Sequence, residues 1–255
     1  MATQHDPQSL SAKPGAWAEL ALTLPVFLAY QLGVVFLHVR NATDLVTGQL
    51  LRISGGDLGA YLGLTVGIGL VLFVVFALLG RGETLSGRKI LQIMVEGAAY
   101  AIAMSTATSW VVGKLFASVP ALAGQAPAAA VGGPVSGLIM SLGAGFYEEL
   151  AFRAVLFGLG AKLLVLLFAK QRVSLVGETP RPSLGAVLIM AAWAIVCAAV
   201  FSGMHYVGAL GDPFDARSFV ARAVLGLALT LVYAMRGFAA AVWTHALYDI
   251  WVLVL

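Results

Sequence analysis

The sequence predicts an all-α membrane protein, a polytopic helix bundle with about seven transmembrane spans. Of the 255 residues, 60% are apolar and only 11% are charged, and the mean hydropathy is +0.94. An average soluble domain is about 45–50% apolar and about 25% charged. The chain therefore has too little charge to cover a water-exposed surface. This excludes a soluble globular enzyme, a disordered chain and a disulfide-stapled secreted module.

Seven long apolar runs support this prediction, because a spanning helix needs about 20 apolar residues. They cover residues 17–39, 58–79, 91–119, 135–169, 184–210, 217–235 and 238–255. The fourth run is too long for a straight crossing of a hydrocarbon core about 30 Å thick. We therefore expect it to tilt, protrude or break near Gly158 and Gly160. In the second run, the spacing of Gly59, Gly63 and Gly67 predicts a face that another helix can approach closely.

The connecting segments are polar or rich in glycine and proline, apart from a mixed loop at 40–57 and a tight turn at 236–237. Lysine and arginine are distributed unevenly between the two sides of the predicted bundle. The N-terminal tail and the loops after spans two, four and six carry Lys13, Arg81, Arg88, Lys89, Lys170, Arg172, Arg181 and Arg236. The opposite side carries Arg40, Arg52, Arg217 and Arg222. Because cytoplasmic loops are enriched in basic residues, a cytoplasmic N-terminus is predicted.

The composition also limits the partners and the covalent structure. The net charge is only +3, and no basic run is interleaved with aromatic residues, so we expect the lipid bilayer and not a nucleic acid as the partner. Cys197 is the single cysteine and lies in an apolar run, so no intramolecular disulfide can form.

Ionisable side chains inside membrane spans are costly and are candidates for function by default. Glu96, Lys114, Lys162 and His38 lie near predicted helix ends or interfaces, where a structural role is favoured. The others fall into three motifs: Glu148-Glu149-Leu-Ala-Phe-Arg153, Phe201-Ser-Gly-Met-His205 and His245-Ala-Leu-Tyr-Asp249.

The first motif places two adjacent carboxylates and an arginine on one helix. Glu149 and Arg153 are four residues apart, so they share a helix face and can pair. Glu148 points about 100° away from Glu149 and is left available. Two adjacent carboxylates in a low-dielectric region also repel each other, and such a carboxylate is poised to accept and release a proton. The alternative is a buried ion pair that only locks helix packing.

His245 and Asp249 are also four residues apart, so the carboxylate can fix the orientation and tautomer of the imidazole. Taken singly, His205 and His245 are each more simply explained as core residues with satisfied hydrogen bonds. Three polar motifs on three separate spans are better explained by one shared site. Counting along the helices puts Glu148 and His245 at a similar depth. His205 is too deep unless its helix tilts or begins outside the core.

The order Glu-Glu-x-x-x-Arg, Phe-x-x-x-His, His-x-x-x-(Asn/Asp) resembles the CPBP family. This family comprises the CAAX prenyl endopeptidases, their bacterial relatives and the bacteriocin-processing and immunity proteins. The phrase Tyr147-Glu-Glu-Leu-Ala-Phe-Arg153 is similar to the usual form of the family motif. The hydropathy pattern predicts a polar tail at 1–16 and three N-terminal spans at 17–134, and the resemblance, which covers residues 135–255, implies an intramembrane protease core there. It also implies a bacterial member in the inner (plasma) membrane.

The resemblance implies a glutamate-type endopeptidase that needs no metal cofactor. In such an enzyme Glu148 and His205 would activate a water molecule, and His245 and the residue at 249 would stabilise the tetrahedral oxyanion. The substrate would be a membrane-anchored peptide or protein, cleaved near a membrane segment or a C-terminal sorting signal. No residue pattern indicates a prenyl-binding groove.

Glu149 and Arg153 would support the site in this family. Position 249 departs from the pattern, because it is Asp here and Asn in many relatives. An ionised aspartate cannot donate a hydrogen bond to an oxyanion. Asp249 is therefore either protonated or orients His245, and we favour orientation.

Three alternatives remain open at this stage. Glu148, His205 and His245 form a two-histidine, one-carboxylate set, which is a known catalytic zinc arrangement. The chain can instead be a non-proteolytic scaffold or immunity protein, which predicts no need for Glu148 or His205. A proton-coupled transporter is the third alternative, because carboxylates and histidines relay protons.

Overall fold

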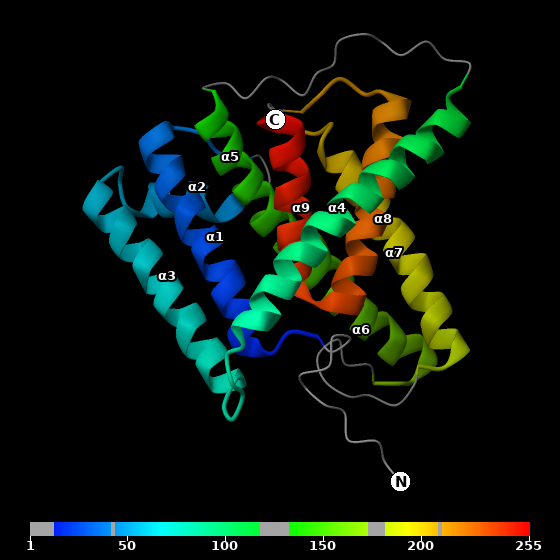
Figure 1. Cartoon of the computed structure of the whole chain (residues 1–255), viewed down its shortest axis with the longest axis horizontal. Coiled ribbons are helices and arrows are strands. Elements are labelled where there is room, and N and C mark those ends of the chain that lie inside the picture. The colour runs from blue at the N-terminus through cyan, green and yellow to red at the C-terminus, as the bar shows by residue number, and fades with distance from the viewer. Residues whose placement is uncertain (1–12, 42–43, 118–132, 173–181, 209–210) are drawn as a thin grey trace.

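The computed structural model describes residues 13–41, 44–117, 133–172, 182–208 and 211–255 (Figure 1). Within these ranges all regular structure is helical, as predicted. The elements are α1 (Ala16–Leu37), α2 (Leu45–Ile53), α3 (Leu58–Leu79), α4 (Gly87–Leu115), α5 (Pro134–Gly143), η1 (Ala144–Leu159), α6 (Gly160–Leu164), η2 (Val165–Ala169), α7 (Leu184–Met204), α8 (Ala216–Arg236) and α9 (Phe238–Leu253). Most of the predicted N-terminal tail, of the loop before α5 and of the loop before α7 lies outside the described residues.

Six helices are long and apolar enough to cross a membrane: α1, α3, α4, the continuous helix Pro134–Ala169, α7 and α8. The predicted runs coincide with these helices to within a few residues, apart from the end of the fifth run. The seventh run forms α9, which has only 16 residues. At about 1.5 Å per residue, α9 is shorter than a hydrocarbon core of about 30 Å. The described part of the chain therefore has six candidate spans and one shorter apolar helix. The mixed loop before α3 contains α2, a short helix that was not predicted.

The long helix Pro134–Ala169 does not break at its glycines. Gly160 has φ −62° and ψ −47°, which is ordinary helical geometry. Of the three predicted alternatives for this helix, the break near Gly158 and Gly160 is therefore wrong. Instead the hydrogen-bonding pattern changes along the helix, from α-helical in α5 to π-helical in η1 and back to α-helical at Gly160. π-Helical segments are frequent at functional sites, and η1 carries the first of the three polar motifs.

The short helix α9 is the centre of the bundle. It contacts α1, α4, α5, η1 and α8, and Figure 1 shows it in red between α1–α3 on one side and α7–α8 on the other. Its residues Ala239, Ala240, Ala241 and Val242 are fully buried. Because these four consecutive residues point to all sides of the helix, α9 is enclosed by protein along this stretch.

Two glycines on neighbouring helices allow close approach to α9. A Cβ added at Gly145 of η1 would lie 2.8 Å from the carbonyl oxygen of Val242 and 3.0 Å from the backbone nitrogen of Ala246. A Cβ at Gly97 of α4 would lie 3.3 Å from the backbone nitrogen of Thr244. Since lipid tails are as apolar as the helices, such close packing is a main source of helix association in membranes.

The glycine face predicted on α3 is not used for packing among the described residues. An added Cβ at Gly63 or Gly67 meets no atom within 4 Å, and both positions are exposed. Helix α3 packs on α1 through a different face, on which Tyr61, Thr65 and Gly69 are buried.

The start of α9 is fixed by ionic contacts from other helices. The Glu19 carboxylate of α1 accepts hydrogen bonds from the first two backbone N–H groups of α9, at 3.2 and 2.5 Å. Arg236, the last residue of α8, forms an ion pair of 2.8 Å with Glu96 of α4. The predicted tight turn at 236–237 is confirmed, with Gly237 at φ 93°. These contacts set the position of α9 two turns before its histidine.

The substitution Gly145→Ala is expected to destabilise the fold, because the new methyl group would press η1 away from the α9 backbone. Overpacking of this kind costs about 1–3 kcal/mol. Gly63→Ala is the matched control, since it adds the same methyl group at an exposed helical position. Thermal unfolding of both purified variants in one detergent checks this. Equal midpoints for the two variants would contradict the packing described here.

Candidate active site

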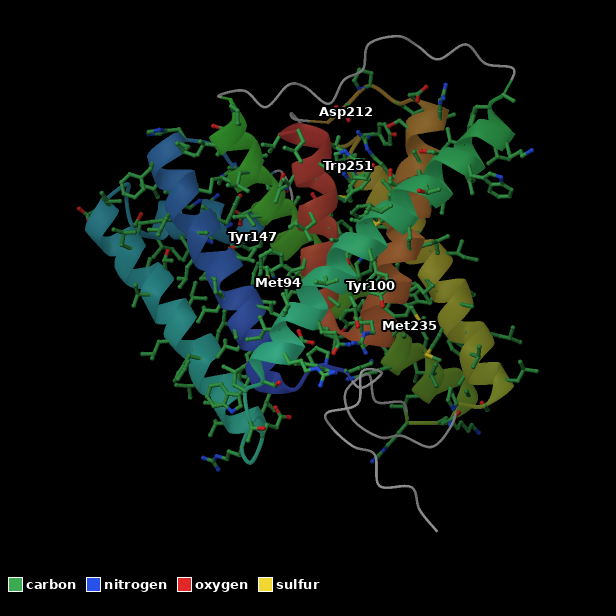
Figure 2. The ribbon with its side chains drawn as sticks, viewed as in Figure 1. Met94, Tyr100, Tyr147, Asp212, Met235 and Trp251 are labelled. Carbon is green, nitrogen blue, oxygen red and sulfur yellow. The ribbon has the colours of Figure 1, made fainter. Side chains whose placement is uncertain are left out.

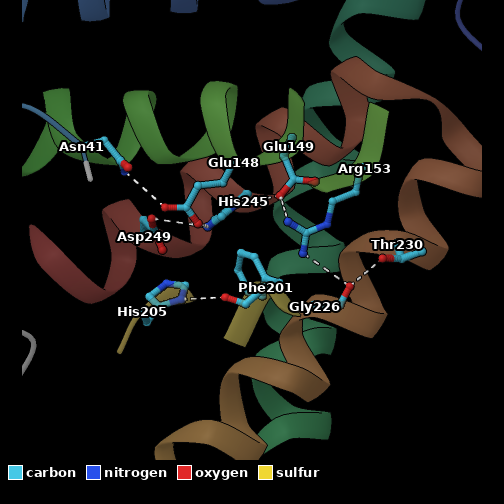
Figure 3. A network of polar contacts seen from close by, with 10 residues as sticks. All are labelled: Asn41, Glu148, Glu149, Arg153, Phe201, His205, Gly226, Thr230, His245 and Asp249. Atoms are coloured by element: carbon cyan, nitrogen blue, oxygen red, sulfur yellow. Dashed lines mark hydrogen bonds and ion pairs between the residues drawn. The ribbon is translucent and has the colours of Figure 1, made fainter. Parts of the chain in front are cut away.

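The three predicted motifs converge on one buried polar cluster (Figure 3). Helix η1 contributes the two glutamates and the arginine, α9 contributes His245 and Asp249, and the end of α7 contributes Phe201 and His205. The segment between α1 and α2 adds Asn41, which faces Glu148.

Glu149 is the hub of the cluster. Its Oε1 atom accepts a hydrogen bond from Arg153 Nη1 at 2.8 Å and lies 2.7 Å from His245 Nδ1. Glu149 and Arg153 are 0% and 1% exposed. The predicted pairing of Glu149 with Arg153 is confirmed. The contact with His245 joins residues 96 positions apart and was not predicted.

Arg153 also ties η1 to α7 and α8. Its Nη2 atom donates to the carbonyl oxygen of Gly226 at 3.4 Å, and that oxygen also accepts from Thr230 Oγ1 at 2.8 Å. Its guanidinium carbon lies 4.3 Å from the ring centroid of Phe201, a cation–π arrangement. A buried guanidinium is tolerated only when it is paired and hydrogen-bonded, and these contacts meet that requirement.

His245 is surrounded by carboxyl groups. Its Nε2 atom lies 3.6 Å from Asp249 Oδ2 and 3.9 Å from Glu148 Oε2. Both distances are ion-pair distances and are longer than a direct hydrogen bond. The orienting contact on the ring is therefore made by Glu149 at Nδ1, whereas the sequence predicted that Asp249 would make it. The geometry leaves Nε2 directed towards the space between Glu148 and Asp249.

Glu148 lies next to Glu149 but faces a different set of partners. It is 6% exposed, and its Oε1 atom lies 3.3 Å from Asn41 Nδ2. Figure 3 shows Glu148, Asp249, His205 and Asn41 towards one side of the cluster, away from Arg153. The separation of the two adjacent carboxylates that the spacing predicted is confirmed.

His205 lies at the end of a helix and not inside one. Helix α7 ends at Met204, and His205 is its C-terminal cap, with Nδ1 3.0 Å from the carbonyl oxygen of Phe201. The Phe201 ring is 5.1 Å from the His205 ring and 6.1 Å from the His245 ring, between centroids. Phe201 thus lies against both imidazoles. No hydrogen bond joins His205 to Glu148 or His245 among the described residues.

The described part of the chain shows no arrangement of side chains that could ligate zinc. There, no group of three or more histidine, cysteine, aspartate or glutamate side chains is arranged to hold a metal ion. The set Glu148, His205 and His245 is therefore not assembled as a metal centre in this structure.

Fold and site together define a class of protein: a polytopic helical membrane protein with a buried carboxylate–histidine–arginine cluster built from separate helices. Residues 130–251 match the family model described as Rce1-like, type II CAAX prenyl endopeptidase. The matched segment is a little under half of the chain and contains all three motifs. It confirms the resemblance and supports a hydrolase of the membrane-protease type. Searches of curated proteins and of solved structures gave no significant match.

We expect Arg153→Ala to lower both activity and stability, because it leaves the buried Glu149 carboxylate without its cation. Breaking a buried ion pair in this way costs about 3–5 kcal/mol. The double variant Arg153→Ala/Glu149→Gln should recover part of that stability, since no lone charge remains. Thermal unfolding and yield in detergent measure both effects. If Arg153→Ala were inactive but as stable and abundant as the parent, Arg153 would act on substrate instead of on the fold.

Proposed function

We propose that this protein is a glutamate-type intramembrane endopeptidase that cleaves a membrane-anchored peptide or protein near a C-terminal membrane segment or sorting signal. One observation carries the proposal: Glu148 lies beside a histidine that a second, arginine-paired glutamate holds in place. These groups come from separate helices. Burying ionisable groups costs free energy, and helix packing alone does not need them, so they are candidates for function. The family match over the same segment supports the protease class.

Glu148 takes the role of general base in this proposal. Its carboxylate accepts a proton from a water molecule as the water oxygen attacks the scissile carbonyl carbon, and the proton then passes to the leaving amine. His205 is the second group assigned to water activation. Its place on the same side of the cluster as Glu148 in Figure 3 supports that assignment.

His245 takes the role of oxyanion donor. Its Nδ1 faces the Glu149 carboxylate, which is an acceptor and therefore keeps a proton on that nitrogen. When Nε2 is also protonated, it can donate towards the oxyanion that forms on the substrate. Asp249, 3.6 Å from Nε2, supports this protonated form by its charge, and Glu149 with Arg153 holds the ring in position.

The location of the substrate follows from the position of the site. We place the scissile bond at the bilayer or its interface, and the burial of the cluster in a chain with six candidate membrane spans supports this. We place the enzyme in a bacterial inner membrane, with its N-terminus in the cytoplasm. The prevalence of basic residues on that side of the bundle supports this orientation.

The variant Glu148→Gln tests the assignment of the base. It keeps size and hydrogen bonding but removes proton acceptance, so cleavage should fall at least about a hundredfold. The assay uses a panel of reporters: a fluorogenic farnesylated CAAX-type peptide, its unprenylated counterpart, and a single-span protein with a C-terminal tag. Glu83→Gln, at an exposed glutamate between α3 and α4, is the matched control. Near-normal cleavage by Glu148→Gln would refute the assignment of the base, whereas a parent protein that cleaves no reporter of the panel would favour a scaffold.

We further propose that catalysis needs no metal, because a carboxylate and an imidazole can together activate water. Activity of the purified enzyme should survive treatment with a strong zinc chelator, and metal analysis should find less than stoichiometric zinc. Loss of activity on chelation, restored by added zinc, would transfer the proposal to a metalloprotease that uses Glu148, His205 and His245.

A further inference from the structure

We propose that Asn41 is a positioning residue for Glu148, supplied by the N-terminal half of the chain outside the segment that matches the family model. The inference rests on the proposed function, because it assigns Asn41 a part in the reaction proposed for Glu148. It also gives the first spans a role at the site, in addition to their packing around it.

The contact itself is a carboxamide donating to a carboxylate inside the protein. Asn41 Nδ2 lies 3.3 Å from Glu148 Oε1, while the other oxygen of that carboxylate faces His245 Nε2 at 3.9 Å. Asn41 is 7% exposed and Glu148 6%. The terminal torsion of a glutamate is soft. A donor on one oxygen and a ring nitrogen near the other therefore restrict the rotation of the group that must meet the water.

The segment that carries Asn41 is itself fixed by hydrogen bonds. The backbone N–H of Asn41 donates to Tyr30 Oη at 2.8 Å, and the Tyr30 hydroxyl donates to Asp44 Oδ2 at 2.9 Å. The backbone N–H of Asp44 donates in turn to the carbonyl oxygen of Asn41 at 3.2 Å. Tyr30 is fully buried and Asp44 is 3% exposed. The side chain of Asn41 is thus presented to Glu148 by a backbone that Tyr30 and Asp44 hold in place.

These contacts belong to a larger buried polar network. Thr47 donates its backbone N–H to Asp44 Oδ1 at 2.8 Å and its hydroxyl to Gln31 Oε1 at 3.2 Å. The Gln31 amide donates to the hydroxyl of Tyr147, the residue before Glu148, and the Tyr61 hydroxyl donates to Gln31. Figure 2 shows Tyr147 beside α1. The network therefore joins α1, α2 and α3 to η1 at the position next to the proposed base.

The backbone of Asn41 is held by contacts that do not involve its side chain. They use the backbone N–H and carbonyl of Asn41, and Asp44 provides the cap of α2. Removing the amide donor keeps these backbone contacts and takes away the donor to Glu148. If the transition state loses a hydrogen bond to a charged group, the rate of the chemical step should fall about ten- to a hundredfold.

The test replaces Asn41 with a side chain of the same shape but without the donor. Asn41→Asp should lower kcat about ten- to a hundredfold on the panel member that the parent enzyme cleaves, with KM changed less than about threefold. Gln49→Glu is the matched control, because it makes the same change from amide to acid at an exposed position of α2. The control should keep the kcat of the parent.

A second arm asks whether Asn41 acts through Glu148. In the Glu148→Gln background, Asn41→Asp should change the residual rate less than about twofold, because the carboxylate that it positions is gone. An equal loss in both backgrounds would overturn the inference. So would an unchanged kcat in Asn41→Asp, or a loss of thermal stability without a loss of kcat in folded enzyme.

The outcomes separate the two proposals. If Glu148→Gln is inactive and Asn41→Asp is fully active, only the positioning role fails. If the parent cleaves no member of the panel, or if Glu148→Gln cleaves normally, the proposed function fails and the role of Asn41 fails with it.

Discussion

The structure depends on one carboxylate oxygen, Oε1 of Glu149, which lies within 2.8 Å of both Arg153 Nη1 and His245 Nδ1. An isolated charge at this depth would cost several kcal/mol. Arg153, on the same helix, supplies the opposite charge, and His245, on another helix, supplies a second polar partner. The side chains that stabilise the buried charge are therefore the ones that fix the imidazole. The same contacts thus stabilise the fold and orient the site, while Glu148 at the neighbouring position faces Asn41 and the Nε2 atom of His245.

The backbone is arranged so that this contact can form. Gly145 lets η1 lie against α9 at backbone distance, and Glu19 holds the first N–H groups of α9. Helix α9 is too short to span a bilayer by itself, but it is enclosed by protein along Ala239–Val242. A helix buried in this way can carry His245 inside the bundle without exposing polar groups to lipid, where they would have no partners.

The N-terminal helices contribute polar contacts as well as packing. A network from Tyr30, Gln31 and Asp44 reaches η1 at Tyr147, the residue before Glu148. Buried polar networks of this kind specify one arrangement of the helices when every member is satisfied. The segment that matches the family model would thus be completed by a part of the chain that carries no recognisable motif.

The sequence by itself determined the class of fold, the position of the long helices and the pairing of Glu149 with Arg153. These properties are local, because hydropathy and a spacing of four residues depend only on the geometry of one helix. The tertiary structure alone decided which glycines pack, since the face at Gly63 and Gly67 remained exposed while Gly145 met α9. It alone decided that Glu149, and not Asp249, hydrogen-bonds to His245, and that Asn41 faces Glu148. Such contacts join residues about a hundred positions apart. The periodicity along one helix does not determine how that helix is rotated against another.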